Sequence, residues 1–230
     1  MTVPAVEARP AATVILLRDR APGFEVLVVL RPPRGFFGGL TVFPGGAVDP
    51  DDDSDLAHLV VPGDHPDRSH RVAALRELAE ETGIALTKGG PMPSPEGTGR
   101  AMLEAMRAAG LELDSAGLTL VSRWVTPEYA PKRFDTRFYL ARANDAPQVR
   151  LDTSELVGHA WVKPSVALDR HRDGEWDLFL PTLAHLRWLD RRSDVEDAIR
   201  SAEGADGRSL IRPRQMDDGS LVPILVPVDE

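Results

Sequence analysis

The segment at residues 76–84, Arg-Glu-Leu-Ala-Glu-Glu-Thr-Gly-Ile, most constrains what this chain can fold into. On a helix, where successive residues turn by about 100°, Glu77, Glu80 and Glu81 fall within one arc. The opposite arc carries mostly apolar residues: Val72, Leu75, Leu78, Ala79 and Thr82. We therefore predict a helix that ends at Gly83, with one face in the core and a cluster of carboxylates on the other.

The carboxylate cluster costs the helix stability. Like charges at these spacings destabilise a helix by about 0.2–0.5 kcal/mol per pair, and no lysine is interleaved to offset them. Several carboxylates beside a glycine-rich turn suit Mg²⁺ or Mn²⁺, which prefer oxygen ligands and bind phosphates. The alternative is a solvated acidic face, which is the commoner explanation for an arbitrary Glu-x-x-Glu-Glu sequence.

The surrounding sequence favours metal binding. Residues 43–52 read Phe-Pro-Gly-Gly-Ala-Val-Asp-Pro-Asp-Asp. Together with the helix they resemble the Nudix box, which is a glycine, five residues, a glutamate, seven residues, and then Arg-Glu-U-x-Glu-Glu-x-Gly-U, where U is aliphatic. The second half of that box matches at every fixed position: Arg76, Glu77, Leu78, Glu80, Glu81, Gly83 and Ile84.

The first half of the box departs from the family pattern. The sixth residue after Gly46 is Asp52 rather than glutamate, and the 23 residues 53–75 stand where the pattern has seven, so 16 residues, taken as 53–68, are inserted. Such an insertion is known in a branch that resembles the coenzyme A and acyl-coenzyme A diphosphatases. Further motifs of that branch also occur here: residues 42–46, Trp124-x-Thr126-Pro127, residues 133–138 and Leu180-Pro181-Thr182.

The resemblance implies the Nudix fold, an α/β (α+β) protein in which an α/β/α sandwich surrounds a mixed sheet. We expect one domain over residues 1–230, with a frayed segment at 1–10 and a helical extension and tail at 164–230. Runs rich in valine and leucine at 13–17 and 24–30 predict a strand hairpin covered on both faces.

The resemblance also implies an activity, the hydrolysis of a diphosphate linkage between a nucleoside and another group. Glu77, Glu80 and Glu81 would hold Mg²⁺ or Mn²⁺, and the Gly45 carbonyl is a further ligand. Glu77 is in addition the candidate for accepting the proton of the attacking water. Arg76 is interpreted as orienting the carboxylates.

Residues outside the helix complete the expected site. Glu155 and Glu128 are candidates for one more acid, because Nudix enzymes often recruit a carboxylate from this later part of the fold. A surface salt bridge in a loop is the alternative for Glu128 and Arg133, and a solvated loop arginine is the alternative for Arg31 and Arg34. The residues expected to contact the substrate and its phosphates are Gly46, Arg31, Arg34 and Arg133.

The flanking motifs favour coenzyme A or an acyl-coenzyme A as substrate, cleaved to 3′,5′-adenosine bisphosphate and a phosphopantetheine. Alternatives within the enzyme class are ADP-ribose, NADH and nucleoside triphosphates, since neither fold nor box sets the substrate. A Nudix fold kept as a ligand-sensing module is an alternative of another class. The intact set of charged residues in the box argues against it, and Asp52 and the insertion argue for it.

Composition excludes several classes of protein. The chain has 230 residues and no cysteine, which excludes disulfides and thiolate metal sites. A net charge of −9 disfavours non-specific binding to nucleic acid. No apolar run approaches the roughly 20 residues of a membrane span, and the first ten residues lack the pattern of a signal peptide. We therefore predict a cytoplasmic protein that binds neither nucleic acid nor membranes.

The rest of the chain gives coarser expectations. A short helical turn is predicted at 55–60, a loop at 87–99, and helices at 100–109, 165–171, 182–191 and 194–203. Ser193 and Glu196 have the spacing of a capping box for the last helix. Segments 209–212 and 221–226 resemble a final hairpin, which either covers a sheet edge or pairs with a second subunit in a homodimer.

Overall fold

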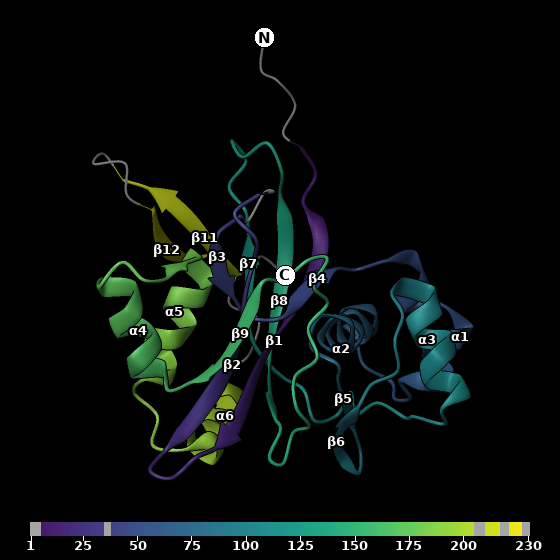
Figure 1. Ribbon diagram of the computed structural model, residues 1–230. Coiled ribbons are helices and arrows are strands. Elements are labelled where there is room, and N and C mark those ends of the chain that lie inside the picture. The colour runs from purple at the N-terminus through teal and green to yellow at the C-terminus, as the bar shows by residue number, and fades with distance from the viewer. Residues whose placement is uncertain (1–5, 35–37, 205–209, 217–220, 227–230) are drawn as a thin grey trace.

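A mixed sheet lies at the centre of the computed structural model, which describes residues 6–34, 38–204, 210–216 and 221–226 (Figure 1). Its strands follow the order β10-β3-β2-β1-β8-β7-β11-β12, while β4 pairs with β1 and β9 with β2. The bounds are β1 (Arg9–Asp19), β2 (Phe24–Leu30), β3 (Leu40–Val42), β4 (Gly45–Ala47), β7 (Thr119–Val125), β8 (Phe134–Arg142), β9 (Gly158–Val162), β10 (Asp177–Leu178), β11 (Leu210–Gln215) and β12 (Leu221–Val226).

Strand β1 contributes to both faces of the sheet because successive side chains point to opposite sides. Val14 and Leu16 are buried in one core, and Ile15 and Leu17 are buried in the other. The strand pairs with β8 in parallel along nine residues, with β2 antiparallel at one end and with β4 antiparallel at the other. The predicted hairpin, covered on both faces, is confirmed.

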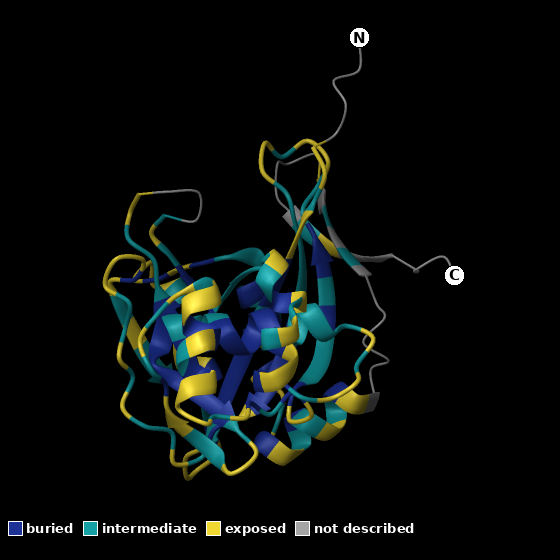
Figure 2. Ribbon diagram, turned by 90° about the vertical axis from the view of Figure 1, so that its right-hand side faces the viewer, coloured by how far each residue is buried: buried dark blue, intermediate teal, exposed yellow. Residues whose placement is uncertain are grey.

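Two layers of helices cover the sheet (Figure 1). On one side α2 (Arg68–Thr82) packs against β1 and β4, with α1 (Asp55–Val60) and α3 (Gly99–Ala108) beyond it, and on the other side lie α4 (Pro164–Arg172), α5 (Leu180–Leu189) and α6 (Val195–Gly204). Buried residues gather between the layers, and exposed residues lie on the outer faces of the helices (Figure 2). This arrangement is the predicted α/β/α sandwich. None of the helices in the described parts of the chain is both long and apolar enough to cross a membrane.

Helix α2 agrees with the sequence prediction. Its predicted core residues are all buried, and Gly83 ends it in the left-handed region with φ of 70° while its N–H donates to the Ala79 carbonyl. A residue with a Cβ is strained at that φ, so glycine is favoured there. The helix therefore presents its carboxylates at a fixed position relative to the sheet.

Three local expectations need correction. Arg9 and Pro10, expected to be frayed, belong to β1, where the Arg9 N–H donates to the Arg133 carbonyl. The predicted loop at 87–99 contains most of a small hairpin, β5 (Ile84–Thr87) with β6 (Gly90–Pro93). The cap of α6 is Asp194, whose carboxylate accepts from the Asp197 N–H at 2.8 Å. In each case a hydrogen bond to a backbone group sets the local structure, and the sequence pattern does not show it.

The C-terminal tail forms the predicted hairpin of β11 and β12, and β11 pairs in parallel with β7. The hairpin therefore covers the β7 edge of the sheet, which was one of its two predicted roles. The part of the predicted segment 209–212 that precedes Leu210 lies outside the described residues. Pairing with a second subunit stays a prediction.

A buried polar chain crosses the second core at His185 of α5. The Nδ1 atom lies 2.7 Å from the Pro181 carbonyl, which only accepts, so Nδ1 carries the proton. Nε2 then accepts from the Ser122 hydroxyl at 2.8 Å, and Ser122 in turn accepts from the Trp124 indole N–H at 3.1 Å. Burial lowers the pKa of His185 to about 4, since the neutral ring is fully satisfied in this core.

Lowering the pH from 7 to 5 should therefore reduce the free energy of unfolding by about 2 kcal/mol through His185 alone. The unfolded chain takes up a proton below about pH 6.5, whereas the folded protein does so only near pH 4. His185→Gln cannot take up this proton and should lose less stability. Urea unfolding at the two pH values measures the difference. The exposed His159→Gln serves as control, and equal losses in wild type and His185→Gln would contradict the assignment.

Candidate active site

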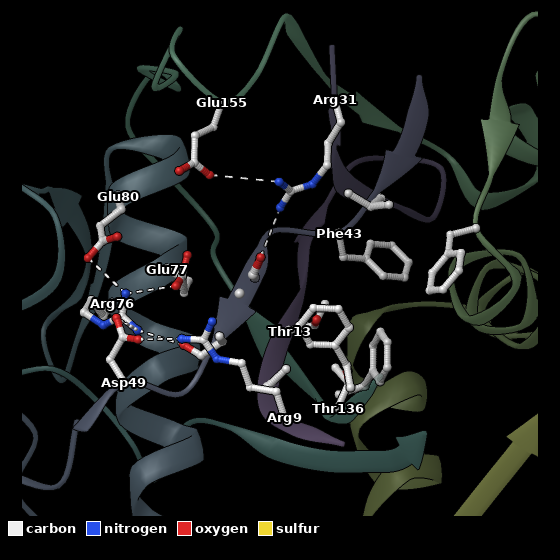
Figure 3. A pocket seen from close by; sticks show the side chains of 18 of the residues that line it. Arg9, Thr13, Arg31, Phe43, Asp49, Arg76, Glu77, Glu80, Thr136 and Glu155 are labelled. Carbon is white, nitrogen blue, oxygen red and sulfur yellow. Dashed lines mark hydrogen bonds and ion pairs between the residues drawn. The ribbon is translucent and has the colours of Figure 1, made fainter. Parts of the chain in front are cut away.

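A cavity of about 570 Å³ opens where α2 faces the β4 loop and the ends of β1 and β8 (Figure 3). One side is charged and carries Glu77 and Glu80 of α2. The other side is largely apolar and carries Phe43 and Phe138. The cavity therefore suits a ligand with a charged part and an apolar part.

Arg76 is the centre of the charged side and is only 2% exposed. Its Nε and Nη2 atoms donate to the two oxygens of Asp52 at 2.8 and 2.9 Å, and Nη2 also donates to the Ala47 carbonyl. Its Nη1 atom donates to Glu77 at 2.9 Å and to Glu80 at 3.2 Å. All five guanidinium hydrogens are thus used, and two of them hold Glu77 and Glu80, as expected if Arg76 orients these carboxylates.

Asp52, which departs from the family pattern, has a structural role. The residue lies in a short 3₁₀ turn, η1 (Pro50–Asp53), and is fully buried. Besides the two bonds from Arg76, its carboxylate accepts from the Asp49 N–H at 2.8 Å. The Asp52 carboxylate therefore both closes the η1 turn and anchors Arg76.

Glu81 turns to a different partner. Its carboxylate accepts from Arg31 Nη2 at 2.8 Å and from the Gly45 N–H at 2.9 Å. Arg31 Nη2 also lies 3.3 Å from the Gly45 carbonyl oxygen. A positively charged group is therefore held by the same two residues, Glu81 and Gly45, that the sequence predicts as metal ligands.

Glu77 and Glu80 line the cavity. Glu80 also accepts from the Gly99 N–H at 2.8 Å, which ties α2 to the start of α3. Gly46 lies directly against Glu77, because a Cβ at Gly46 would be 2.4 Å from that carboxylate. The absence of a side chain at Gly46 therefore keeps the Glu77 carboxylate in place at the cavity wall.

Burial dominates the electrostatics of the glutamates. It raises the pKa of Glu77 to about 7 and the pKa of Glu81 to about 8, against the opposing effects of Arg76 and Arg31 respectively. The pKa of Glu80 is also raised by burial. Independently of these shifts, four carboxylates, those of Asp52, Glu77, Glu80 and Glu81, share only the guanidinium groups of Arg76 and Arg31, a charge balance that favours a further cation.

The residues present fit a hard divalent cation. The donors are carboxylate oxygens and one carbonyl oxygen, the set that Mg²⁺ and Mn²⁺ prefer. Arg31 already places a cationic group between Glu81 and Gly45. Within the described residues no three acidic or histidine side chains converge as a preformed metal site. The joint ion site of the three glutamates therefore stays a prediction.

The other predicted residues divide into two groups. Glu155 lines the cavity with its carboxylate 4.0 Å from Arg31 Nη1, and Gly46 lines it as well. Arg34 and Glu128 are exposed and do not line it. Arg133 does not line it either, because its guanidinium donates to the Thr126 and Val6 carbonyls. These backbone contacts are invisible in the sequence pattern.

Sequence analysis missed Arg9, Thr98 and Gly99. Arg9 lines the cavity beside Asp49, at 3.1 Å, and Thr98 and Gly99 line it next to Glu80. Arg9 falls in the segment expected to be frayed, and Thr98 and Gly99 fall at the end of the expected loop. None of the three therefore carries a sequence pattern that indicates a site residue. Their positions depend on contacts with residues far away in the chain.

Comparison with known proteins identifies the family. The family model of the NUDIX domain matches residues 7–180 of this chain. The chain belongs to the Nudix family. The residues of the Nudix box are therefore those that hold α2, the β4 loop and η1 together around Arg76.

Individual relatives agree with this assignment. Nudix hydrolase 7 of Caenorhabditis elegans is 32% identical over 198 residues, which cover 82% of this chain and 62% of that protein. The acyl-coenzyme A diphosphatase NUDT19 of Homo sapiens is 27% identical over 237 residues, 77% of this chain and 63% of that protein. The chain thus spans somewhat less than two thirds of these relatives.

One solved structure matches this fold over nearly its whole length. The crystal structure of a NUDIX hydrolase from Alicyclobacillus acidocaldarius has a TM-score of 0.73 and 33% identity. The match covers 84% of this chain and 96% of that chain. The sandwich described above is therefore the Nudix fold.

Replacing Asp52 with alanine should lower the free energy of unfolding by about 3–5 kcal/mol, because it leaves the buried Arg76 without its main partner. Asp52→Glu should cost about 1–3 kcal/mol, since an extra methylene must fit a fully buried position. Urea unfolding measures both. The matched control is Asp53→Ala, whose side chain is 76% exposed. A loss below about 1 kcal/mol for Asp52→Ala would contradict the anchoring role.

Proposed function

We propose that this protein is a metal-dependent pyrophosphohydrolase that cleaves the diphosphate bond of a nucleoside diphosphate-linked substrate. The observation that carries the proposal is a cavity whose charged side combines Glu77 and Glu80 with two arginines, Arg9 and Arg31. Carboxylates for a cation and arginines for phosphate oxygens are the groups that this reaction needs.

The chain's own residues have distinct tasks in this reaction. Glu77, Glu80, Glu81 and the Gly45 carbonyl would hold Mg²⁺ or Mn²⁺, which when bound would neutralise charge on the diphosphate and lower the pKa of the attacking water. Arg9 and Arg31 would bind the phosphate oxygens, with Arg31 yielding its contacts to Glu81 and the Gly45 carbonyl to the ion, and Arg76 keeps Glu77 and Glu80 in position. The oxygen of water bonds to one phosphorus, the bridging P–O bond breaks, and Glu77 accepts the water's proton.

The substrate that we favour is coenzyme A or an acyl-coenzyme A, split into 3′,5′-adenosine bisphosphate and a phosphopantetheine. The human relative named as an acyl-coenzyme A diphosphatase supports this choice. The two-sided cavity supports it as well, because coenzyme A joins a charged nucleotide to a less polar arm. ADP-ribose, NADH and nucleoside triphosphates are the competing substrates.

Glu77→Gln and Glu80→Gln should each reduce turnover by at least about 100-fold, since each removes a carboxylate that faces the reacting groups. The measurement is product release with Mg²⁺ or Mn²⁺ from coenzyme A, acetyl-coenzyme A, ADP-ribose, NADH and a nucleoside triphosphate. Glu104→Gln, on the exposed face of α3, is the matched control and should keep wild-type turnover.

The outcomes separate the parts of the proposal. Metal-dependent cleavage of coenzyme A that both variants lose supports the full proposal. Cleavage of another member of the panel keeps the mechanism and rejects the substrate. Binding without turnover of any compound rejects the enzyme and favours a ligand-sensing module.

Gly46→Ala should lower turnover at least about tenfold with little loss of stability, because the added Cβ would lie 2.4 Å from the Glu77 carboxylate and displace it. Side-chain movement at the cavity wall costs little packing. Turnover and thermal unfolding measure the two effects. Gly158→Ala, whose Cβ would meet Leu30 at 3.8 Å, is the control and should be neutral in both. Full turnover of Gly46→Ala would show that the position of Glu77 does not matter.

A further inference from the structure

A second, smaller cavity of about 180 Å³ adjoins the candidate active site, and we call it the annex. It is bounded by the β7–β8 loop, the start of α5 and the C-terminal hairpin. The residues that belong to it and not to the main cavity include Trp124, Thr126, Tyr129, Ala130, Leu180 and Pro213. Four residues form a wall shared by the two cavities: Phe134, Thr136, Phe138 and Phe179.

The annex offers a ligand almost nothing but hydrocarbon. None of its lining residues carries a charge. The Trp124 indole N–H is already used by Ser122, and the Thr126 hydroxyl bonds to the backbone of Phe134. Besides the Tyr129 and Thr136 hydroxyls the lining offers few polar partners, so a polar ligand group would lose water here for little return, whereas a carbon chain would gain contacts.

The position of the annex relates it to the reaction. Thr136, one of the four residues shared by the two cavities, lies across the main cavity from the carboxylates of α2 (Figure 3), so the annex adjoins the side opposite those carboxylates. The cavity that adjoins the carboxylate side, of about 320 Å³, is lined by Glu80, Glu96, Asp152 and Arg150 and does not suit hydrocarbon. Of the two smaller cavities, only the annex therefore suits an apolar part of a substrate that is bound at Glu77.

We propose that the annex binds the acyl chain of an acyl-coenzyme A substrate and sets its preferred length. This inference rests on the proposed function. A dry protein cavity of about 150 Å³ holds benzene, so the annex has room for about six carbons. Hydrolysis should therefore improve from acetyl to hexanoyl thioesters and level off for longer chains.

The test compares coenzyme A with its acetyl, butanoyl, hexanoyl, octanoyl and palmitoyl thioesters, using the Mg²⁺-loaded protein. Each methylene that enters the annex should raise kcat/KM by up to about fourfold, the factor for full burial of one methylene. Ala130→Phe fills the annex and should remove the dependence on chain length without changing kcat/KM for coenzyme A. Ala108→Phe, at an exposed position of α3, is the matched control and should keep it.

A second variant keeps the inference testable if Ala130→Phe does not fold. Tyr129 is 65% exposed, so Tyr129→Ser opens the wall of the annex with little risk to the fold and should also weaken the dependence on chain length. Three results would overturn the inference: no dependence in the wild type, an unchanged dependence in Ala130→Phe, or an equal loss for coenzyme A and its thioesters. The last would place the pantetheine arm in the annex instead.

Binding separates this inference from the proposed function. Calorimetry of Glu77→Gln with Mg²⁺ measures the affinities of hexanoyl-coenzyme A and coenzyme A without turnover. If the wild type hydrolyses neither compound, the proposed function fails. At least tenfold tighter binding of the hexanoyl compound, lost in the double variant with Ala130→Phe, would then still support the annex. Equal affinities, or no binding of either compound, would overturn it.

Discussion

The buried guanidinium of Arg76 is the constraint on which the rest of the site depends. A charge 2% exposed is unfavourable unless every donor is used, and here five hydrogens reach Asp52, Ala47, Glu77 and Glu80. These bonds fasten the η1 turn and the β4 loop to α2. The like charges of α2, which destabilise an isolated helix, are thus partly neutralised by the group that positions them.

The sheet supplies the second constraint, because it brings the glycine loop to α2. Strand β4 pairs with the first half of β1, and a Cβ at Gly45 would lie 2.4 Å from the Ala12 carbonyl. Glycine is therefore required where the loop crosses β1, and the Gly45 N–H and carbonyl reach Glu81 and Arg31 as a result. Two cores, one on each face of β1, hold this crossing rigid.

The sequence predicts the parts of this protein that depend on neighbours in the chain. The bounds of α1, the end of α2 at Gly83 and the hairpin of β1 and β2 follow from periodicity and caps. Arg9 and Gly99 escape prediction because they reach the site through strand pairing and a contact with Glu80. Arg133 does not line the cavity, because its guanidinium donates to the nearby Thr126 carbonyl and to the Val6 carbonyl, which is far away in the chain.

The central claim is that Arg76 holds Glu77 and Glu80 as part of a cation site facing the cavity. A Mn²⁺ titration followed by electron paramagnetic resonance tests it without relying on any substrate. The account predicts saturable Mn²⁺ binding that weakens at least about tenfold in Glu77→Gln and in Glu80→Gln, and that is unchanged in Glu104→Gln. Equal Mn²⁺ affinity in all four proteins would contradict the account.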